Sequence, residues 1–416
     1  MEYIKRALEP RIQKSLTAMP AVYIHGPRQA GKSTLTQEIL RTWSSAEYVT
    51  FDDISMLSAA KEDPMGFLQN LKTPAVLDEV QMVPEIFRGI KLQIDKKRME
   101  SKSTSNNQYL LTGSTSILSL PKLADALVGR MEIFTLYPFS ATESHSSKGQ
   151  FLDTLFTSQL TLAKAPFPKE PFTTLIQKTT FPEIVCNNNI NITKWFESYI
   201  TTLLYRDIRE LAEIEKYHLL PNMLKIMASR VGGLVNDAQM ARDLQMNVMT
   251  YRRYKALLSQ MFLINLVPPW YRNIGKRFVK SPKLFLVDTL MLCYLLGIDD
   301  LSREPDPNTL GFLLENFVAQ ELTKTLAITN NGQLFHFRTN DNKEIDFIVE
   351  YGGSKIVAIE VKAKKTVQAS DFKHIKELKT LTPTEFVKGI VLYLGEDIIP
   401  FGEKLFALPL EALWSL

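Results

Sequence analysis

The chain has 416 residues, of which 45% are hydrophobic and 23% are charged, and its formal net charge is +4. This length exceeds what one hydrophobic core usually serves, and the composition excludes a disordered or fibrous protein, so we expect two or three globular domains. The two cysteines, Cys186 and Cys293, lie far apart without CxxC spacing, which excludes a disulfide framework and a zinc site of the usual kind.

The N-terminal residues 1–14, MEYIKRALEPRIQK, have the charged, amphipathic pattern of a helix and lack the pattern of a signal peptide. The most apolar stretch, residues 284–298, is too short to span a bilayer and contains Asp288. We therefore expect a cytoplasmic protein that has no membrane partner.

Residues 1–142 alternate between apolar runs and helical segments. The runs, which predict strands, are AVYIH, AEYVTFDD, PAVLDE, QYLLTGS and MEIFTLYPF. This alternation is typical of an α/β fold in which helices cover both faces of a mostly parallel sheet.

A phosphate-binding loop follows the first predicted strand. The segment GPRQAGKST matches the pattern GxxxxGK followed by Ser or Thr, and it opens a predicted helix. Backbone N–H groups of such a loop converge on phosphate oxygens, helped by the helix dipole. We expect Lys32 to reach the β- and γ-phosphates of ATP and Ser33 to ligate Mg²⁺. The predicted ATP-binding residues are Gly26, Pro27, Arg28, Gln29, Ala30, Gly31, Lys32, Ser33 and Thr34.

Two acids end the predicted strand PAVLDE. Asp78 is expected to bind Mg²⁺ through water, and Glu79 to orient or deprotonate the attacking water. The next strand ends in Thr112 and Ser114, which either sense the γ-phosphate or form an ordinary turn.

An arginine is the third predicted element of catalysis. Either Arg130, in LVGR, or Arg28, within the loop, is expected to neutralise charge in the transition state. The sequence leaves open whether Arg130 acts in its own chain or across an interface, and it leaves the oligomeric state open as well.

The segments GPRQAGKST, AVLDEVQ, LLTGST and LVGR with the following LYPFS resemble a group of bacterial and archaeal AAA-like P-loop ATPases with a C-terminal domain of uncharacterised function. The resemblance continues through residues 199–211 and 276–297. It implies a P-loop ATPase core of the additional-strand, catalytic-glutamate type, a winged-helix middle and a restriction-endonuclease-like α/β C-terminal domain. We accordingly expect a P-loop ATPase domain at 1–142, a linker and helical extension at 143–192, a helical or winged-helix domain at 193–300 and the nuclease-like domain at 301–416.

The middle of the chain contains a predicted helix-turn-helix. Asn236 and Asn247 are placed to cap its two helices, and Gln245 holds the turn position where many such sequences have glycine. Basic residues gather within 252–283. They either bind the phosphate backbone of a nucleic acid through counterion release, or they are solvated charges on a module that docks a protein partner.

The C-terminal segment KEIDFIVEYGGSKIVAIEVKAKK predicts a β-hairpin with a Gly-Gly turn. Residues two apart on a strand share a face, so Glu360 and Lys362 point the same way. Glu315, Asp346, Glu360 and Lys362 resemble the catalytic E…D…ExK set of restriction-endonuclease-type nucleases, which implies Mg²⁺ held by Asp346 and Glu360. The alternative is a set of cross-strand ion pairs in a fold that has lost cleavage.

Two functions remain open. One is an Mg²⁺-dependent ATPase that acts on nucleic acid through the winged-helix and nuclease-like modules. The other is an ATP-dependent molecular switch that docks a protein partner and carries an inactive nuclease-like domain. A divalent ion among Glu315, Asp346 and Glu360 would favour the first, and an acid cluster blocked by the middle domain would favour the second.

Overall fold

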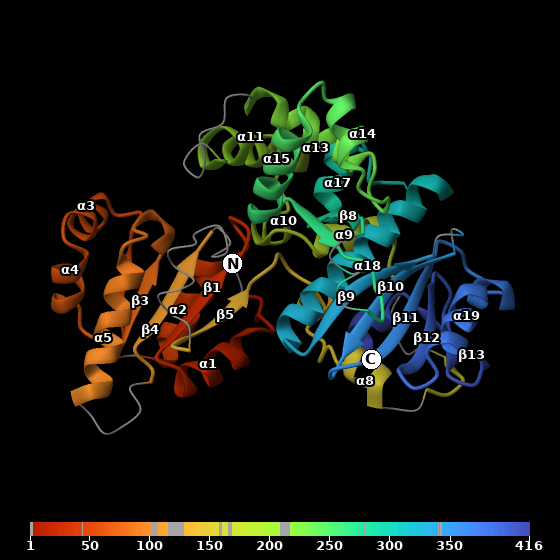
Figure 1. Ribbon diagram of the computed structural model, residues 1–416, viewed down its shortest axis with the longest axis horizontal. Coiled ribbons are helices and arrows are strands. Elements are labelled where there is room, and N and C mark those ends of the chain that lie inside the picture. Colours follow the sequence, from red (N-terminus) through yellow and green to blue (C-terminus); the bar gives the residue numbers. More distant parts are fainter. Residues whose placement is uncertain are drawn as a thin grey trace. The chain divides into compact units, whose positions relative to one another are not determined.

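The computed structural model describes residues 3–43, 45–100, 106–114, 129–157, 160–164, 169–208, 217–273, 275, 277, 280–303, 305–339, 341 and 343–416. The chain divides into two compact units, which are described separately (Figure 1). The first unit contains Met1–Pro138, Phe181–Glu183 and Gln260–Phe262. The second contains Phe139–Thr180, Ile184–Ser259 and Leu263–Leu416.

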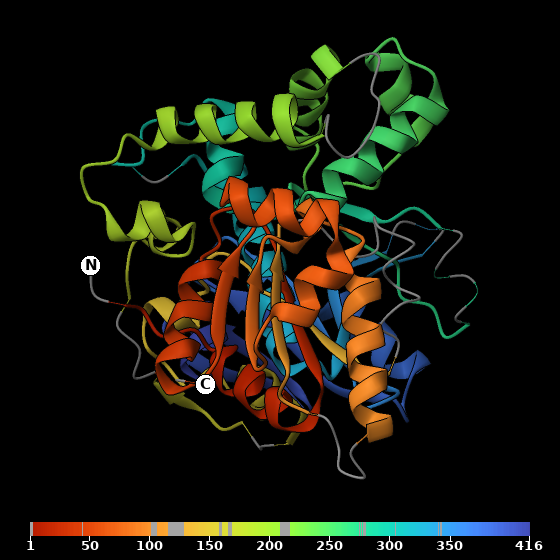
Figure 2. The ribbon, with the colours of Figure 1, turned by 90° about the vertical axis from the view of Figure 1, so that its left-hand side faces the viewer.

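The first unit contains a parallel sheet of five strands in the order β2-β3-β4-β1-β5 (Figure 2). Their bounds are β1 Ala21–His25, β2 Glu47–Thr50, β3 Ala75–Asp78, β4 Tyr109–Gly113 and β5 Met131–Thr135. Strand β4 lies between β1, which leads into the glycine-rich loop, and β3, which ends in the acids. The predicted parallel sheet and its additional strand are therefore confirmed.

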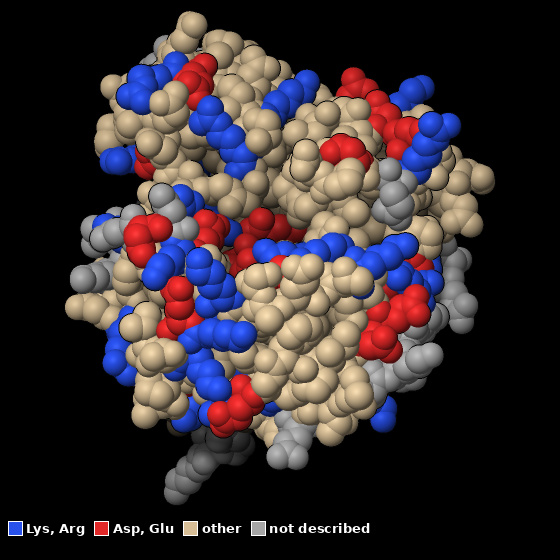
Figure 3. Space-filling view, turned by 90° about the vertical axis from the view of Figure 1, so that its right-hand side faces the viewer, with Lys and Arg blue, Asp and Glu red and all other residues tan. Residues whose placement is uncertain are grey.

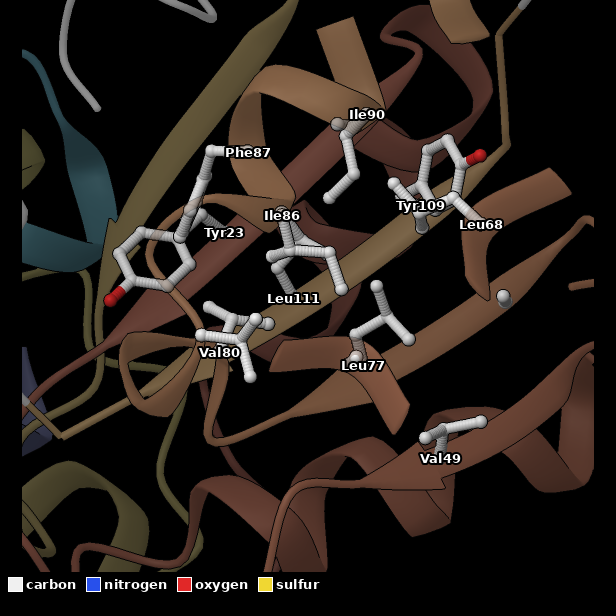
Figure 4. Packing of buried hydrophobic residues seen from close by; sticks show 14 of the residues in the cluster. Tyr23, Val49, Leu68, Leu77, Val80, Ile86, Phe87, Ile90, Tyr109 and Leu111 are labelled. Carbon is white, nitrogen blue, oxygen red and sulfur yellow. The ribbon is translucent and has the colours of Figure 1, made fainter. Parts of the chain in front are cut away.

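Helices cover both faces of this sheet because its strand residues are apolar on both sides. The helices are α1 Glu9–Ala18, α2 Lys32–Thr42, α3 Ile54–Glu62, α4 Pro64–Asn70 and α5 Ile86–Glu100, with a short 3-10 helix η1 at Val80–Met82. On one face, Tyr23, Leu77 and Leu111 pack against Ile86 and Phe87 of α5 (Figure 4). On the other face, α1 contacts β1 and α2 contacts β4. Full burial of one such large apolar side chain stabilises the fold by about 1.5–3 kcal/mol.

The N-terminal part of the second unit is mainly helical, as the spacing of its apolar residues predicts. Its elements are α7 Ala141–Ser144, α8 Phe151–Thr157, β6 Ala163–Lys164, α9 Phe172–Lys178, α10 Pro182–Cys186, α11 Ile192–Thr202, η3 Leu203–Asp207, η4 Tyr217–Leu219, α13 Leu220–Ala228, α14 Asp237–Asp243, α15 Val248–Gln260, β7 Ile264–Val267, β8 Lys283–Leu286 and α17 Thr289–Leu296. The first two residues of α10, Pro182 and Glu183, belong to the first unit.

The predicted pair of capped helices is confirmed at α14 and α15. The side chain of Asn236 accepts a hydrogen bond from the N–H of Gln239, and that of Asn247 accepts one from the N–H of Met249. Between the helices Gln245 has φ +51°, a left-handed conformation that glycine adopts more easily. Strands β7 and β8 pair antiparallel after α15.

The C-terminal part of the second unit is a mixed sheet in the order β6-β13-β14-β12-β11-β10-β9. Its further elements are α18 Pro307–Thr329, β9 Gly332–Arg338, β10 Glu344–Tyr351, β11 Lys355–Lys362, η5 Ala369–Phe372, α19 Lys373–Leu381, β12 Phe386–Tyr393, β13 Asp397–Gly402, β14 Leu405–Pro409 and α20 Ala412–Ser415. The predicted hairpin is confirmed, because β10 and β11 pair antiparallel. Helix α19 packs Ile375 and Leu378 against sheet residues such as Ile348.

The segment 143–192 differs from a simple linker. Besides its helices it contributes β6, which pairs antiparallel with β13 of the C-terminal sheet. The short apolar runs of this segment show no alternation of apolar and polar residues, so the sequence does not predict that β6 pairs with β13. Among the described residues, no helix has the length and apolar character needed to cross a membrane.

Candidate functional site

The glycine-rich loop lies between the end of β1 at His25 and the start of α2 at Lys32. At Gly26 any Cβ would lie 2.1 Å from the carbonyl oxygen of Leu136, so only glycine fits. Gly31, at the N-cap of α2, has φ +90°, and Gln29 has φ +58°. These left-handed residues compress the loop at the N-terminus of α2, where backbone N–H groups lack partners inside the helix.

Lys32 is a buried cation whose ammonium group contacts backbone carbonyl groups. Its side chain is 4% exposed, and its Nζ donates hydrogen bonds to the carbonyl oxygens of Gly26, at 3.1 Å, and Pro27, at 2.8 Å. No carboxylate of the described residues lies within 4.0 Å of this Nζ. Burial lowers the pKa of Lys32 to about 8, although Glu79 and Asp78 act in the opposite direction. A buried ammonium that only carbonyl groups satisfy is suited to a polyanion such as a triphosphate.

Asp78 and Glu79 lie in the same electrostatic environment as Lys32. One oxygen of Asp78 accepts a short hydrogen bond from the hydroxyl of Thr112, and the other accepts one from the hydroxyl of Tyr48 at 2.8 Å. Glu79 has φ +59°, and its N–H donates to the Thr112 hydroxyl at 3.2 Å. A non-glycine residue held in this left-handed conformation is typical of functional sites.

Gln81 is a site residue that the sequence prediction missed. Its Nε2 donates to Oε2 of Glu79 and, at 3.0 Å, to Oγ of Ser114. A Cβ at Gly113 would lie 2.2 Å from the hydroxyl of Tyr23 and 2.8 Å from Oε1 of Gln81, so this arrangement requires glycine there. Of the two alternatives for Thr112 and Ser114, their contacts favour a role in positioning the acids and not an ordinary turn. The available signal was the glutamine in AVLDEVQ.

Arg6 is a second residue that the prediction missed. Its side chain is 4% exposed, and it donates to the carbonyl oxygens of Ala30, at 2.7 Å, and Tyr137, at 2.5 Å. The guanidinium thus joins the loop to the segment after β5. An arginine in an amphipathic N-terminal segment carries no sequence signal for such a contact.

The prediction that Arg130 neutralises charge at its own P-loop is wrong. Its carbonyl accepts a hydrogen bond from the N–H of Ala21, the first residue of β1, whereas the loop follows the last residue of that strand. Parallel strands place these two positions at opposite edges of the sheet. The guanidinium instead pairs with Asp95 of α5, with an Nε–Oδ1 distance of 2.7 Å. Arg28 lies closer to the nucleotide loop than Arg130 does, since its positive charge helps to lower the pKa of Lys32.

A cluster of acids surrounds a lysine in the second unit. Nζ of Lys283 lies 2.8 Å from Oε1 of Glu315, 2.6 Å from Oε1 of Glu344 and 3.5 Å from Oδ1 of Asp346. We call Glu315, Glu344 and Asp346 the acid cluster. The Lys283 side chain is 1% exposed. The prediction that Lys283 forms part of a basic surface is therefore wrong, because β8 is buried along its whole length.

Glu360 and Lys362 lie beside the acid cluster and point the same way, as predicted. Oε1 of Glu360 lies 2.6 Å from Nζ of Lys362, and Oδ2 of Asp346 accepts a hydrogen bond from the N–H of Val361 at 2.8 Å. Burial, with the charge of Asp346, raises the pKa of Glu315 to about 7 and that of Glu360 to about 8. The described carboxylates include no group of three or more arranged to hold a metal ion. One oxygen of Asp346 faces the ammonium of Lys283, and one oxygen of Glu360 pairs with Lys362. Metal binding at Asp346 and Glu360 stays a prediction.

The basic residues of 252–283 are largely paired with acids rather than gathered on a free surface. Arg252 and Lys255 both bind Asp237, at 2.9 and 2.5 Å. Arg277 binds Glu350 at 2.7 Å and lies over the ring of Phe335. Lys276 is outside the described residues. Any phosphate contact at Arg252, Lys255 or Arg277 would compete with these acids. Nucleic-acid contact through residues 252–283 stays a prediction.

Three family models match parts of the chain. Residues 18–145 match the AAA domain family. Residues 169–302 and 310–413 match two domains of unknown function, DUF8612 and DUF4143. The glycine-rich loop, Asp78 and Glu79 therefore lie in the part of the chain that is similar to the AAA domain family.

The relatives extend beyond the residues that match the AAA domain family. An uncharacterised protein of Mycobacterium tuberculosis, Rv2008c, is 29% identical over 412 residues, 98% of this chain and 84% of that protein. An uncharacterised protein of Haemophilus influenzae is 25% identical, covering 85% of this chain and 86% of that one. Among solved structures, the Walker-type ATPase paby2304 of Pyrococcus abyssi has 15% identity and a TM-score of 0.40, over 70% of this chain and 96% of that one.

Proposed function

We propose that this protein is an ATP-driven molecular switch, in which the AAA domain binds and hydrolyses Mg²⁺-ATP and its nucleotide state controls the second unit. One observation carries the enzymatic part of the proposal. The buried ammonium of Lys32 has no carboxylate partner among the described residues and lies in a loop that glycines compress at a helix N-terminus. A triphosphate supplies the missing negative charge.

The residues have distinct roles in this proposal. Backbone groups of residues 26–34 and Nζ of Lys32 hold the phosphates, and Ser33 and Asp78 hold Mg²⁺, Asp78 through a water molecule. The ion, when bound, neutralises charge on the β- and γ-phosphates. Glu79 orients the attacking water and accepts its proton, and Gln81 fixes the carboxylate that does so.

For the second unit we propose binding of a protein partner without cleavage of nucleic acid. The mixed sheet, α18 and the positions of Glu315, Asp346, Glu360 and Lys362 support a restriction-endonuclease-like fold, and α14, α15 and the β7-β8 pair support a winged helix. The contacts of Lys283 favour a nuclease-like domain that does not cleave. The ammonium of this lysine, which belongs to β8 of the middle region, lies among the three carboxylates of the acid cluster. We keep 193–300 and 301–416 as the proposed bounds of these two domains.

An enzyme that acts on nucleic acid is the second candidate. Figure 3 shows one face of the molecule on which Asp and Glu side chains lie in a hollow beside a band of Lys and Arg side chains. In the second unit, Arg338 pairs with Glu344 and Lys362 pairs with Glu360. A phosphate backbone next to a metal-binding cluster requires charges of both signs in this way.

The test is ATP turnover with and without DNA or RNA, combined with a Mg²⁺-dependent cleavage assay. We expect turnover that Lys32→Ala abolishes, and no cleavage product. Cleavage that Lys362→Ala eliminates would favour the second candidate instead. Absence of turnover in the wild-type protein would contradict the enzymatic part of the proposal.

A further inference from the structure

The carboxylate of Asp78 is held from both strands that flank β3 in the sheet. The Asp78 side chain is 2% exposed, and each of its two oxygens accepts a hydrogen bond from a hydroxyl group. Thr112 of β4 donates to Oδ1, and Tyr48 of β2 donates to Oδ2 at 2.8 Å. A carboxylate that is bound at both oxygens cannot turn about its Cβ–Cγ bond without losing a hydrogen bond, so these two hydroxyl groups fix its orientation.

The hydroxyl of Tyr48 ends a chain of hydrogen bonds that runs along β2. Thr50 lies two residues further on, on the same face of the strand, and its side chain hydrogen-bonds to the Tyr48 hydroxyl. Oγ1 of Thr50 accepts the N–H of Asp52 at 3.2 Å. Since a carboxylate only accepts hydrogen bonds, the Tyr48 hydroxyl donates its proton to Asp78 and accepts from Thr50. The donors therefore all point toward Asp78, and each hydrogen bond in such a chain strengthens the next.

The two hydroxyl groups orient Asp78 without removing its charge. An ionised carboxylate has about four acceptor positions, of which Tyr48 and Thr112 each use one. The remaining positions can accept the O–H of a water molecule. Mg²⁺ keeps several water ligands in a near-ideal octahedron, so a water molecule bound to this ion is best met by an acceptor of fixed orientation.

We propose that Tyr48 is a positioning residue of the nucleotide site, whose hydroxyl holds Asp78 in the orientation that accepts a water ligand of Mg²⁺. This inference rests on the proposed function, in which Asp78 binds Mg²⁺ through water. Tyr48 acts through Asp78 and not on the nucleotide, so loss of its hydroxyl raises the Mg²⁺ requirement and leaves nucleotide binding without Mg²⁺ unchanged. Removing a group that orients a metal ligand in this way typically lowers metal affinity about 10- to 100-fold.

The experiment measures binding of a non-hydrolysable ATP analogue by calorimetry at a series of Mg²⁺ concentrations. We expect Tyr48→Phe to need about tenfold more Mg²⁺ than the wild type for half of the gain in affinity that Mg²⁺ gives, and to bind the analogue equally well in EDTA. Tyr109→Phe is the matched control. Tyr109 pairs with Ala75, the first residue of β3, whereas Asp78 is the last, so this variant should keep the Mg²⁺ requirement of the wild type.

A double variant tests whether Tyr48 acts through Asp78. We expect Asp78→Asn to raise the Mg²⁺ requirement by itself, and Tyr48→Phe to add nothing to it in the double variant, because no charged ligand is left to orient. A purely structural hydroxyl would lower the free energy of unfolding of Tyr48→Phe, measured with denaturant, and would leave its Mg²⁺ requirement unchanged.

An unchanged Mg²⁺ requirement in Tyr48→Phe overturns the proposal, and so does a lower one, which would mean that the hydroxyl competes with Mg²⁺ for Asp78. If circular dichroism shows that Tyr48→Phe is unfolded, Thr50→Val takes its place, because this variant removes the donor to Tyr48. We expect Thr50→Val to raise the Mg²⁺ requirement as well, and an unchanged value overturns the proposal.

The wild-type chain separates failure of this inference from failure of the proposed function. A wild-type chain that binds no analogue, with or without Mg²⁺, refutes the proposed function and this inference with it. A wild-type chain whose binding depends on Mg²⁺ to the same extent as that of Tyr48→Phe refutes the inference alone.

Discussion

The amide of Gln81 donates a hydrogen bond to the carboxylate of Glu79, two residues earlier in the chain. The same amide nitrogen binds Ser114 at the end of the neighbouring strand. The catalytic orientation proposed for Glu79 therefore depends on two strands of the sheet and not on its own backbone alone.

Replacement of Gln81 by alanine is expected to lower kcat of ATP hydrolysis about tenfold while leaving the affinity for ATP unchanged. The reason is that Glu79 remains present but loses the group that orients it, whereas loss of a general base itself costs about 10²- to 10⁴-fold. Steady-state kinetics and nucleotide binding check this prediction. Glu79→Gln is the comparison variant, with a larger loss of kcat and intact binding. Equal kcat in Gln81→Ala and the wild type would exclude the positioning role.

Replacement of Arg6 by alanine is expected to destabilise the first unit by roughly 1.5–3 kcal/mol, because two hydrogen bonds from a charged group are lost. One of the accepting carbonyl groups is buried and the other is partly buried. The affinity for ATP is expected to fall as well, since Ala30 is part of the loop. Denaturant unfolding and nucleotide binding measure the two effects. Lys14→Ala, an exposed position on α1, is the control and should change neither. An Arg6→Ala protein of wild-type stability would contradict this account.

The stability of the first unit is expected to fall as the pH drops from 6.5 to about 4, partly because of His25. Burial lowers the pKa of this histidine from 6.5 to about 4, so in that window the unfolded chain binds a proton that the folded chain does not. The free energy of unfolding then decreases with falling pH by up to about 1.4 kcal/mol per pH unit for this group. Unfolding of His25→Asn should show a shallower pH dependence. His218→Asn, at an exposed position, is the control variant and should keep the pH dependence of the wild type. If the free energy of unfolding has the same pH dependence in His25→Asn as in the wild type, the lowered pKa of His25 is refuted.

The fold of the first unit and its nucleotide loop were predictable because their signals are local. Gly26, Gly31 and Lys32 lie within one short segment, and the position of a strand before it and a helix after it fixes where they point. The hairpin at Asp346 and Glu360 was predictable for the same reason, since strand alternation and a Gly-Gly turn define it.

The residues that escaped prediction act through contacts between distant parts of the sequence. Arg6 meets Ala30, and Lys283 meets Glu315 and Asp346, only once the fold is formed. Nothing in the sequence around Lys283 distinguishes it from the basic residues before it. Arg130 shows a different error: it directly precedes β5, so it lies at the N-terminal edge of the parallel sheet, whereas the nucleotide loop follows the C-terminal end of β1.

The most direct test of the central claim is equilibrium binding and turnover of Mg²⁺-ATP by the wild-type chain, Lys32→Ala and Glu79→Gln. We expect the wild type to bind and hydrolyse ATP, Lys32→Ala to do neither, and Glu79→Gln to bind ATP with turnover reduced at least about 100-fold. Undiminished ATP binding by Lys32→Ala, or none by the wild-type protein at millimolar ATP, would contradict the assignment of this loop as the nucleotide site.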